Sequence, residues 1–386
     1  MNKPEPFSLA VSDASIADLS SRLNNTRFPD EIEDSGWSYG TEKKSLISLL
    51  EYWQKDFSWR EFEDRFNLFD QFTLDIDDLQ THFIHQRSNH DCATPILITH
   101  GWPGSILEFI NVIDRLTQPE KFGGDASDAF HVICPSLPGF GWSAPASSPG
   151  MNAEAIAKRH AKLMNVLGYD KYIAQGGDWG AIITKQIALV DPDHCIAIHL
   201  NMVPVGPPSD SENPMQGVEE AEMLGLNRSE FIQATGMGYY HIQSTRPQTL
   251  GYGLADSPAG LMAWIVEKFF EWSDCQGELS NGVNIDLLVA NVAWYWYSNS
   301  ITSSARLYFE ESHKNSPSRF VETPTGVAVY PLEIVQSPKV WAEKEYNIVY
   351  WSRQDKGGHF AAMEQPEIFT LDIRSFKKEL ASLKII

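Results

Sequence analysis

The chain has 386 residues, of which 42% are hydrophobic and 12% aromatic, enough to bury a large core in one domain with an insertion or in two domains. This composition excludes extensive disorder, which requires low hydrophobicity. Asp and Glu outnumber Lys and Arg by 51 to 30, giving a formal net charge of −21 that is spread along the chain. The charge argues against a nucleic-acid partner, because nucleic acids bind basic surfaces.

Cysteine usage and the lack of long apolar runs indicate the cellular context. The four cysteines show neither close pairing nor the spacing of metal ligands, and we interpret them as reduced thiols: Cys92, Cys134, Cys195 and Cys275. The first residues, MNKPEPFSLAVSD, contain neither the basic start nor the apolar run of a signal peptide. No segment approaches about 18 uninterrupted apolar residues. We expect a soluble cytoplasmic protein without a metal site. The sequence leaves the oligomeric state open, a homodimer included.

Residues 1–70 are expected to form a helical and irregular N-terminal arm. Apolar residues recur at helical spacing at Ile16, Leu19 and Leu23, and a similar pattern covers residues 41–57. The segment is rich in aromatic residues and shows no strand signal. We therefore predict an arm without strands that wraps around a larger domain.

From residue 72 onward, short β-rich runs alternate with helical stretches. The predicted strands are FTLDI (72–76), THFIHQ (81–86), PILITH (95–100), FHVICP (130–135), KYIAQ (171–175) and IAIHL (196–200). Such alternation is typical of a mostly parallel sheet with crossover helices, and the nearly apolar runs PILIT and HVICP fit strands covered on both faces. We therefore predict that residues 71–203 form the first part of an α/β core.

The strand signal disappears between residues 204 and 320, where helical and loop sequence with many aromatic residues takes over. It returns at GVAVYP (326–331) and NIVYWS (347–352). The simplest interpretation is a helical insertion between two strands of one sheet, placed as a lid over that sheet. Residues 204–320 are thus the predicted lid, and residues 321–386 are the predicted second part of the core.

A glycine-rich turn, GGDWG (176–180), separates the predicted strand KYIAQ from a helical stretch. This is the context of a nucleophile elbow, which needs small residues two before and two after the nucleophile, here Gly176 and Gly180. The elbow has Asp178 where Ser is common. A carboxylate that attacks saturated carbon forms an alkyl ester on the enzyme, which predicts an alkyl-transferring hydrolase. The alternative is an ordinary turn in which Asp178 caps the helix.

The motif HGWPGS (100–105) directly follows PILIT, the position from which an α/β hydrolase takes a backbone N–H for its oxyanion hole. The amides of Trp102 and Trp179 are candidates to bind the oxyanion formed when water attacks an ester on Asp178. His100 is a possible base by residue type. We interpret it instead as a residue that shapes this loop.

The candidate base and acid follow the last two predicted strands. His359, in GGHF (357–360), precedes a helix expected to begin near residue 365 and lies at the sheet edge where doubly wound folds bind ligands. Glu333, just beyond GVAVYP, is the candidate carboxylate that orients the imidazole, with Asp355 as the alternative. The resulting order of Asp178, Glu333 and His359 is nucleophile, acid and base, the order of α/β hydrolases.

Together these motifs resemble the epoxide hydrolases of the microsomal type, and the resemblance covers nearly the whole chain. The arm is similar to that family's N-terminal domain in LSSRLNNTRFPD (19–30) and WSYG (37–40). The motifs HGWPGS, GGDWG and GGHFAAMEQP (357–366) match its oxyanion, nucleophile and base motifs. Membrane-bound members have a hydrophobic N-terminal anchor, whereas this chain starts at the arm and so resembles the soluble microbial or fungal branch.

The resemblance implies the α/β-hydrolase fold and a reaction without cofactor or metal. In that reaction an apolar or aryl epoxide and water give a vicinal diol through a hydroxyalkyl ester on Asp178. The family also holds the epoxide oxygen with two lid tyrosines. The segments GYYHIQ (238–243) and SARLY (304–308) match those that carry them, which assigns Tyr239 and Tyr308, with Tyr240 as the alternative to the first.

Two other functions fit parts of the pattern. A haloalkane dehalogenase shares the Asp elbow, the following Trp and the His base. It needs donors for a halide and not an acid for oxygen, so the tyrosine pair favours the epoxide hydrolase. A non-catalytic protein that binds a hydrophobic ligand would lack a nucleophile, acid or base, and none is missing from this sequence.

Overall fold

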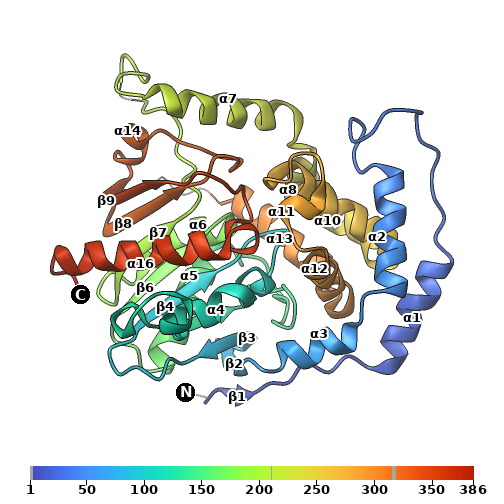
Figure 1. Cartoon of the computed structure of the whole chain (residues 1–386), viewed down its shortest axis with the longest axis horizontal. Helices are drawn as coiled ribbons and strands as arrows, with labels where there is room; N and C mark the ends of the chain where they lie inside the picture. Colours follow the sequence, from blue (N-terminus) through green and yellow to red (C-terminus); the bar gives the residue numbers. More distant parts are fainter. Residues whose placement is uncertain (1–2, 210, 315–318) are drawn as a thin grey trace.

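A nine-stranded sheet forms the centre of the structure, a computed structural model that describes residues 3–209, 211–314 and 319–386 (Figure 1). The strand order is β1-β2-β3-β5-β4-β6-β7-β8-β9. The strands are β1 (Glu5–Pro6), β2 (Gln71–Ile76), β3 (Leu79–Gln86), β4 (Thr94–Thr99), β5 (Phe130–Pro135), β6 (Tyr172–Gly176), β7 (Cys195–Leu200), β8 (Val321–Val329) and β9 (Tyr346–Arg353).

The sheet is antiparallel at one edge and parallel elsewhere. Strands β1, β2, β3 and β5 pair antiparallel in that order, and every pair from β5 through β4 to β9 is parallel. Strand β5 is buried along its whole length, as its apolar run predicts. The α/β-hydrolase fold expected from the sequence is therefore confirmed.

Helices cover both faces of the parallel part. The elements outside the arm and the insertion are η1 (Ile106–Phe109), α4 (Ile110–Thr117), η2 (Pro119–Phe122), η3 (Ala126–Asp128), α5 (Ala153–Val166), α6 (Trp179–Val190), α14 (Lys339–Ala342), α15 (Ala361–Glu364) and α16 (Pro366–Ser382). Helices α4 and α16 pack together in front of the sheet in Figure 1, and α5 packs against α6. The right-handed crossovers from β4 to β5 and from β5 to β6 run in opposite directions along the sheet, which places α4 and α5 on opposite faces.

The N-terminal arm contains a strand, so the expectation that it would have none was wrong. Strand β1 pairs with β2 through Glu5 and Thr73 and through Pro6 and Phe72. The outer edge of β2 would otherwise leave backbone groups unpaired, and β1 supplies partners for them. The helices of the arm are α1 (Asp13–Asn24), α2 (Lys43–Lys55) and α3 (Trp59–Phe66).

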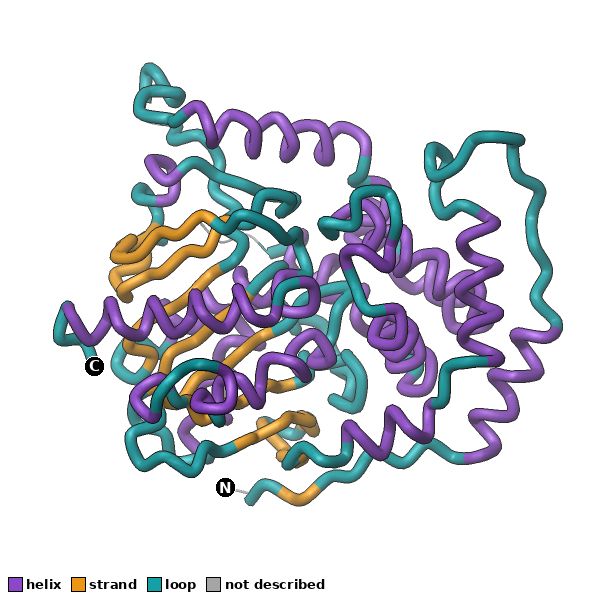
Figure 2. The backbone as a smooth tube through the Cα atoms, viewed as in Figure 1, coloured by secondary structure: helices purple, strands orange, loops and turns teal. Residues whose placement is uncertain are grey.

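A helical insertion separates the neighbouring parallel strands β7 and β8. Its helices are α7 (Glu220–Thr235), α8 (Gly238–Thr245), α9 (Pro247–Asp256), α10 (Pro258–Trp272), α11 (Leu279–Gly282), α12 (Ile285–Ser298) and α13 (Ile301–Ser312). Residues 210 and 315–318 of the predicted lid lie outside the described residues. The strands occupy the left half of the view, and the arm helices with α8 to α13 lie mostly in the right half, whereas α7 runs along the top above the strands (Figure 1 and Figure 2).

The insertion helices are packed on more than one side. Helix α12 is buried at every position from Leu287 to Tyr295, which is typical of a helix enclosed by its neighbours. On the side away from the sheet, α1 and α2 of the arm contact α10 (Figure 1). Arg22 of α1 also donates a hydrogen bond to the Asp256 carboxylate at 2.8 Å. The arm therefore helps to hold the insertion in place beside the sheet.

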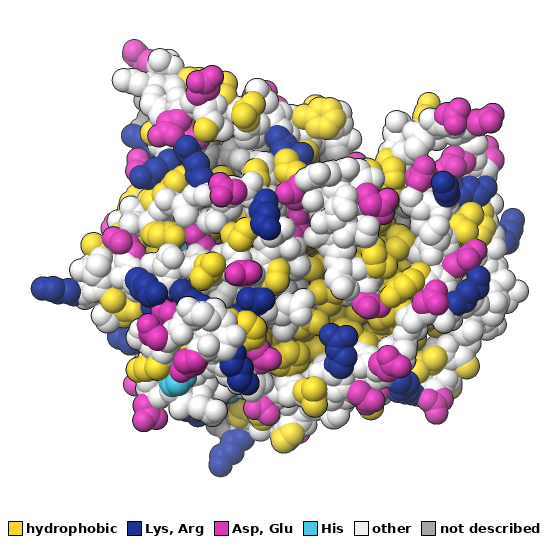
Figure 3. Space-filling view, viewed as in Figure 1, with side chains coloured by type: hydrophobic (Ala, Val, Ile, Leu, Met, Phe, Trp, Pro, Cys, Tyr) yellow, Lys and Arg dark blue, Asp and Glu magenta, His cyan; other side chains and the backbone are white. Residues whose placement is uncertain are grey.

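Acidic side chains are scattered over the face seen in Figure 3 and do not form one patch, in keeping with the spread of charge along the sequence. Among the described residues, no helix is both long enough and apolar enough to cross a membrane. The four cysteines are free thiols, with Cys92 exposed and the other three buried.

Candidate active site

Asp178 occupies the turn between β6 and α6. Its backbone has φ 52° and ψ −131°, a conformation that residues other than glycine rarely adopt and that costs free energy. A Cβ at Gly176 would lie 2.1 Å from the carbonyl oxygen of Gly180, and a Cβ at Gly180 would lie 1.9 Å from that of Thr99. Both positions therefore require glycine, as in a nucleophile elbow.

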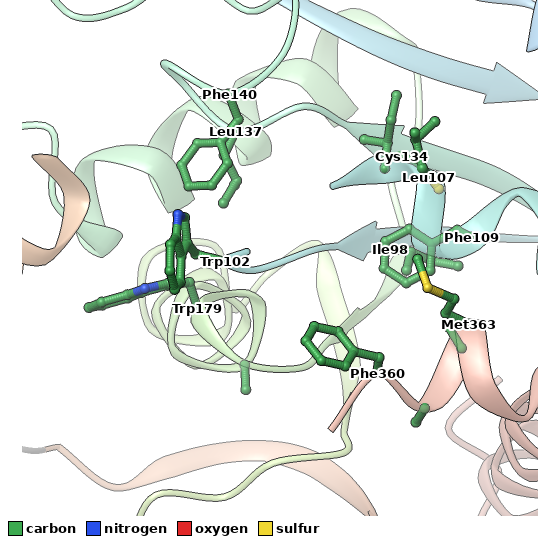
Figure 4. Packing of buried hydrophobic residues seen from close by; sticks show 14 of the residues in the cluster. Ile98, Trp102, Leu107, Phe109, Cys134, Leu137, Phe140, Trp179, Phe360 and Met363 are labelled. Carbon is green, nitrogen blue, oxygen red and sulfur yellow. The ribbon is translucent and has the colours of Figure 1, made fainter. Parts of the chain in front are cut away.

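The loop after β4 contacts the Asp178 carboxylate. The backbone N–H of Trp102 donates to Asp178 Oδ1 at 2.7 Å. A Cβ at Gly101 would approach this oxygen to 2.1 Å, so only glycine permits such a close approach. Trp179 is the first residue of α6, and its amide has no acceptor within the helix. The rings of Trp102 and Trp179 lie next to each other (Figure 4).

His359 lies on the loop between β9 and α15, beside Asp178. Its Nε2 is 3.3 Å from Asp178 Oδ2, and its Nδ1 is 2.6 Å from Glu333 Oε1. The same Glu333 oxygen accepts the backbone N–H of Ile334 at 2.6 Å. Asp355, the alternative acid, is exposed. The structure thus connects Asp178, His359 and Glu333 and leaves Asp355 outside this chain of contacts.

The protonation of His359 depends on its two carboxylate neighbours. Burial disfavours the imidazolium, but the charge of Glu333 and the hydrogen bonds with Asp178 and Glu333 outweigh burial. The pKa of His359 is consequently raised well above its ordinary value. Because Asp178 supplies part of this stabilisation, a reaction that neutralises Asp178 lowers the pKa of His359.

Tyr239 of α8 and Tyr308 of α13 meet above the oxyanion loop. Their ring centroids are 5.8 Å apart, and the Tyr239 ring stacks on Trp102 at 5.3 Å. Tyr308 places its ring edge to face with Trp102 and Trp179. The Tyr308 hydroxyl is buried, and the polar groups nearest to it are the Tyr239 hydroxyl and the indole N–H of Trp179. Burial is the main cause that raises the pKa of both tyrosines, so both keep the proton needed for hydrogen-bond donation.

Tyr240 has a different environment. Its side chain is partly exposed, and its hydroxyl lies 3.3 Å from Ser312 Oγ near the end of α13. Tyr239, by contrast, is 8% exposed and packs on Trp102. The geometry therefore favours Tyr239 over Tyr240 as the partner of Tyr308.

His100 is buried within the oxyanion loop and away from the proton-transfer chain. The N–H of Leu137 donates to His100 Nε2 at 3.2 Å, so Nδ1 carries the proton and donates to the Gly101 carbonyl at 3.0 Å. Burial lowers the pKa of His100 to about 4. Both ring nitrogens are thus engaged in holding the loop, which fits the structural role expected from the sequence.

Glu108 is a half-buried carboxyl group that no motif in the sequence analysis includes. It lies in η1 against Gly104 of the oxyanion loop, where a Cβ on Gly104 would be 1.7 Å from Glu108 Oε1. Burial raises its pKa to about 8, and the charge of Asp178 adds to the shift while that of His359 opposes it. The signal that could have identified Glu108 is an acidic residue inside the apolar run ILEFI.

Glu364 of α15 was also missed and has the same kind of signal, an acidic residue that follows the apolar run FAAM. Its carboxylate accepts backbone N–H bonds from Gly358 at 3.0 Å and Phe360 at 2.9 Å, the two neighbours of His359. Burial raises its pKa to about 7. Within the described residues, no group of three or more His, Cys, Asp or Glu side chains is placed to hold a metal ion.

The sheet order and the strained Asp between β6 and α6 define an α/β hydrolase whose elbow carries a carboxylate. Comparison with known families agrees with this class. The family described as "alpha/beta hydrolase fold" matches residues 94–235, and the family described as "Epoxide hydrolase N terminus" matches residues 4–109.

Relatives and solved structures carry the assignment further. A Stigmatella aurantiaca protein assigned as an epoxide hydrolase is 43% identical over 376 residues, which cover 97% of this chain and 85% of the relative. Epoxide hydrolase 1 of Sus scrofa is 35% identical over 399 residues, covering 96% of this chain and 88% of the relative. The juvenile hormone epoxide hydrolase of the silkworm Bombyx mori superposes with a TM-score of 0.92 at 33% identity, covering 100% of this chain and 96% of that structure. The chain therefore belongs to the epoxide hydrolase family.

Proposed function

We propose that the protein hydrolyses an apolar or aryl epoxide to a vicinal diol through a hydroxyalkyl ester on Asp178. The observation that carries this proposal is the placement of a strained carboxylate between a His-Glu pair on one side and two buried tyrosines on the other. Family membership supplies the reaction class.

In the first step, Asp178 attacks an epoxide carbon and its electron pair forms the ester bond while the ring C–O bond breaks. Oδ1 is occupied by the Trp102 amide, which leaves Oδ2 as the attacking oxygen. Tyr239 and Tyr308 donate hydrogen bonds to the ring oxygen, and one of them gives up its proton as the alkoxide develops. The product is a neutral hydroxyalkyl ester and a tyrosinate.

In the second step, His359 removes a proton from water, and the resulting hydroxide attacks the Asp178 carboxyl carbon. Esterification removes the charge of Asp178, which lowers the pKa of His359, so the imidazolium gives its proton to the tyrosinate and the neutral ring can act as a base. Glu333 orients the ring through Nδ1. The amides of Trp102 and Trp179 bind the oxyanion. Collapse expels the diol, protonated by His359, and the carboxylic acid proton of Asp178 then passes to His359, which restores the resting imidazolium.

Aromatic rings around the nucleophile support an apolar or aryl substrate. Trp102, Trp272, Tyr239 and Tyr308 contact one another through their rings, and Trp272 also packs edge to face against His359. Such a lining favours desolvated hydrophobic groups. A haloalkane releases a halide ion that needs no proton from the tyrosines, whereas an epoxide oxygen does. A non-catalytic binding role would leave the strained elbow unexplained.

The test combines a substrate panel with two variants. The panel contains aryl, alkyl and terpenoid epoxides, juvenile hormone among them, with haloalkanes as controls. We expect diol from epoxides, no halide release, no turnover by freshly purified Asp178→Asn, and a covalent adduct in the intact mass of His359→Gln. Diol formation by the fresh Asp178→Asn protein at the parent rate would refute the proposal, and deamidation must be checked by mass.

The proposal also covers the domain bounds, the cellular location and the oligomeric state of the chain. We assign residues 1–70 to the arm, 71–203 and 321–386 to the core, and 204–320 to a lid, supported by the insertion between β7 and β8. Four free cysteines support a cytoplasmic location. Sedimentation equilibrium distinguishes a monomer from a homodimer, and limited proteolysis tests whether the lid is released as a unit.

A further inference from the structure

Glu364 holds the loop of His359 from both sides. One oxygen of its carboxylate, Oε2, accepts from the N–H of Gly358 at 3.0 Å, and the other, Oε1, accepts from the N–H of Phe360 at 2.9 Å. Oε2 also accepts from the N–H of Asp274 at 2.7 Å, on the insertion between α10 and α11. Three N–H donors on one half-buried carboxylate fix the His359 loop and the connection between α10 and α11 relative to each other.

The same loop is attached to the insertion at two more points. The N–H of His359 itself donates to the carbonyl of Trp272 at 2.9 Å, and the N–H of Gly357 donates to Asp274 Oδ2 at 3.1 Å. Trp272 is the last residue of α10, so its carbonyl has no acceptor role within the helix. A Cβ on Gly358 would lie 2.4 Å from this carbonyl, which shows how closely the two backbones approach.

We infer that Glu364 and Asp274 form a clasp that positions His359 by fixing its loop to the end of α10, so that the insertion and the base keep one relative placement. This inference rests on the proposed function, because it assigns the clasp to the step that His359 performs. Glu364 contacts only backbone amides in this cluster and is a positioning residue. Nothing in the proposed chemistry requires it to exchange a proton with the substrate.

The clasp should matter more for ester hydrolysis than for alkylation. In alkylation the attacking group is Asp178, held by the elbow and by the Trp102 N–H, whereas the hydrogen bonds of the Glu364 carboxylate go to Asp274 and to the loop of His359. In hydrolysis, Nε2 of His359 must accept a proton from a water beside the ester carbon. A misplacement of about 1 Å can cost about 10²-fold in rate. Loss of the clasp therefore predicts an enzyme that forms the ester normally and releases it slowly.

The experiment measures the two steps separately in the full-length protein by single-turnover kinetics on a styrene-type epoxide. Glu364→Gln removes one acceptor and places an amide N–H against a backbone donor, while the size of the side chain is kept. Glu367→Gln, an exposed glutamate in the first turn of α16, is the matched control. Asp274→Ala, which removes the acceptor of Gly357, is the second variant in case Glu364→Gln folds poorly.

We expect Glu364→Gln to slow hydrolysis by at least tenfold, with alkylation within about twofold of the parent, so that the adduct accumulates during turnover. Asp274→Ala should shift the two rates in the same direction to a smaller extent, and Glu367→Gln should match the parent. Equal losses in both steps, or unchanged hydrolysis in both folded clasp variants, would overturn the inference. The proposed function fails separately, if the parent makes no diol or His359→Gln forms no adduct.

Discussion

Glu333 Oε1 lies 2.6 Å from His359 Nδ1, and this contact directs the other ring nitrogen, Nε2, toward Asp178. Both Glu333 and His359 are almost fully buried, so water does not screen the pair. The nitrogen next to Glu333 must carry a proton whenever the carboxylate is ionised. Nε2 is then the nitrogen free to accept a proton from water once Asp178 is esterified.

Removal of the Glu333 charge should therefore impair hydrolysis far more than removal of the Asp355 charge. We expect Glu333→Gln to slow ester hydrolysis by about 10²-fold or more, since an equivalent change in a Ser-His-Asp triad costs on the order of 10⁴ in kcat. Asp355→Asn serves as the control, because Asp355 is exposed. Steady-state kcat for both variants decides the assignment, and a larger loss from the Asp355 change would reverse it.

The pKa of His359 should report the charge of Asp178. Asp178→Asn removes a negative charge and an ionic hydrogen bond from the imidazolium, so the raised pKa of His359 should fall. Titration by ¹⁵N-¹H NMR of the ring measures this shift, with Asp355→Asn as the control. If the Asn variant titrates at the parent pH, Asp178 does not stabilise the imidazolium.

The same shift predicts how stability changes with pH. A group whose folded pKa is raised binds its proton more tightly in the folded state, so its stabilisation is complete below the unfolded value of about 6.5 and is lost as pH rises through the folded pKa. In Asp178→Asn, the free energy of unfolding should fall less as pH rises over this range. Urea denaturation of both proteins at a series of pH values above 6.5 measures it, and identical pH slopes would contradict the prediction.

Most of the fold could be predicted because apolar runs mark buried strands. All eight predicted strand segments overlap observed strands, whereas β1 was missed. Strand β1 has two residues, one of them Pro6, and exists only through its pairing with β2, so it has no periodicity to detect. Strand β8 begins at Val321, before the predicted start, and its register shifts around Pro324 let the strand continue past a residue that usually ends one.

The candidate site could be predicted to the extent that chain order reflects the α/β-hydrolase topology. Asp178, Glu333 and His359 each follow a strand of one sheet, so their meeting at one edge follows from the fold. The contact of Glu364 with Asp274 joins residues 90 positions apart, and it depends on how the insertion packs. No local pattern contains that information.

The glycines of the elbow should contribute to the stability of the fold as well as to catalysis. Gly180→Ala would put a Cβ 1.9 Å from the carbonyl oxygen of Thr99, and we expect a loss of about 1–3 kcal/mol in the free energy of unfolding, as for other overpacked sites. Gly253→Ala in α9 is the matched control, since a Cβ there meets nothing within 4 Å. The control should gain about 0.4–1 kcal/mol because alanine restricts the unfolded chain. Equal urea midpoints for the two variants would contradict this account.

Tyr239 and Tyr308 should each contribute part of the stabilisation of the alkoxide. We expect Tyr239→Phe and Tyr308→Phe each to slow alkylation toward the mild end of the range of about 10²–10³-fold seen when one oxyanion donor is removed, because the other hydroxyl still donates. The double variant should be nearly inactive. Tyr240→Phe is the control, since its hydroxyl lies at Ser312 and not above Trp102.

Ester hydrolysis should distinguish this role from a general loss of structure. The tyrosines lie on the insertion, and both raised pKa values keep their hydroxyls protonated as donors before the ring opens. Hydrolysis instead depends on His359 and on the backbone N–H at Asp178 Oδ1, so its rate in each Phe variant should stay close to that of the parent. Single-turnover kinetics resolves the two rates. A double Phe variant that alkylates at the parent rate would remove Tyr239 and Tyr308 from the mechanism. If Tyr240→Phe slows alkylation more than Tyr239→Phe does, Tyr240 and not Tyr239 is the partner of Tyr308.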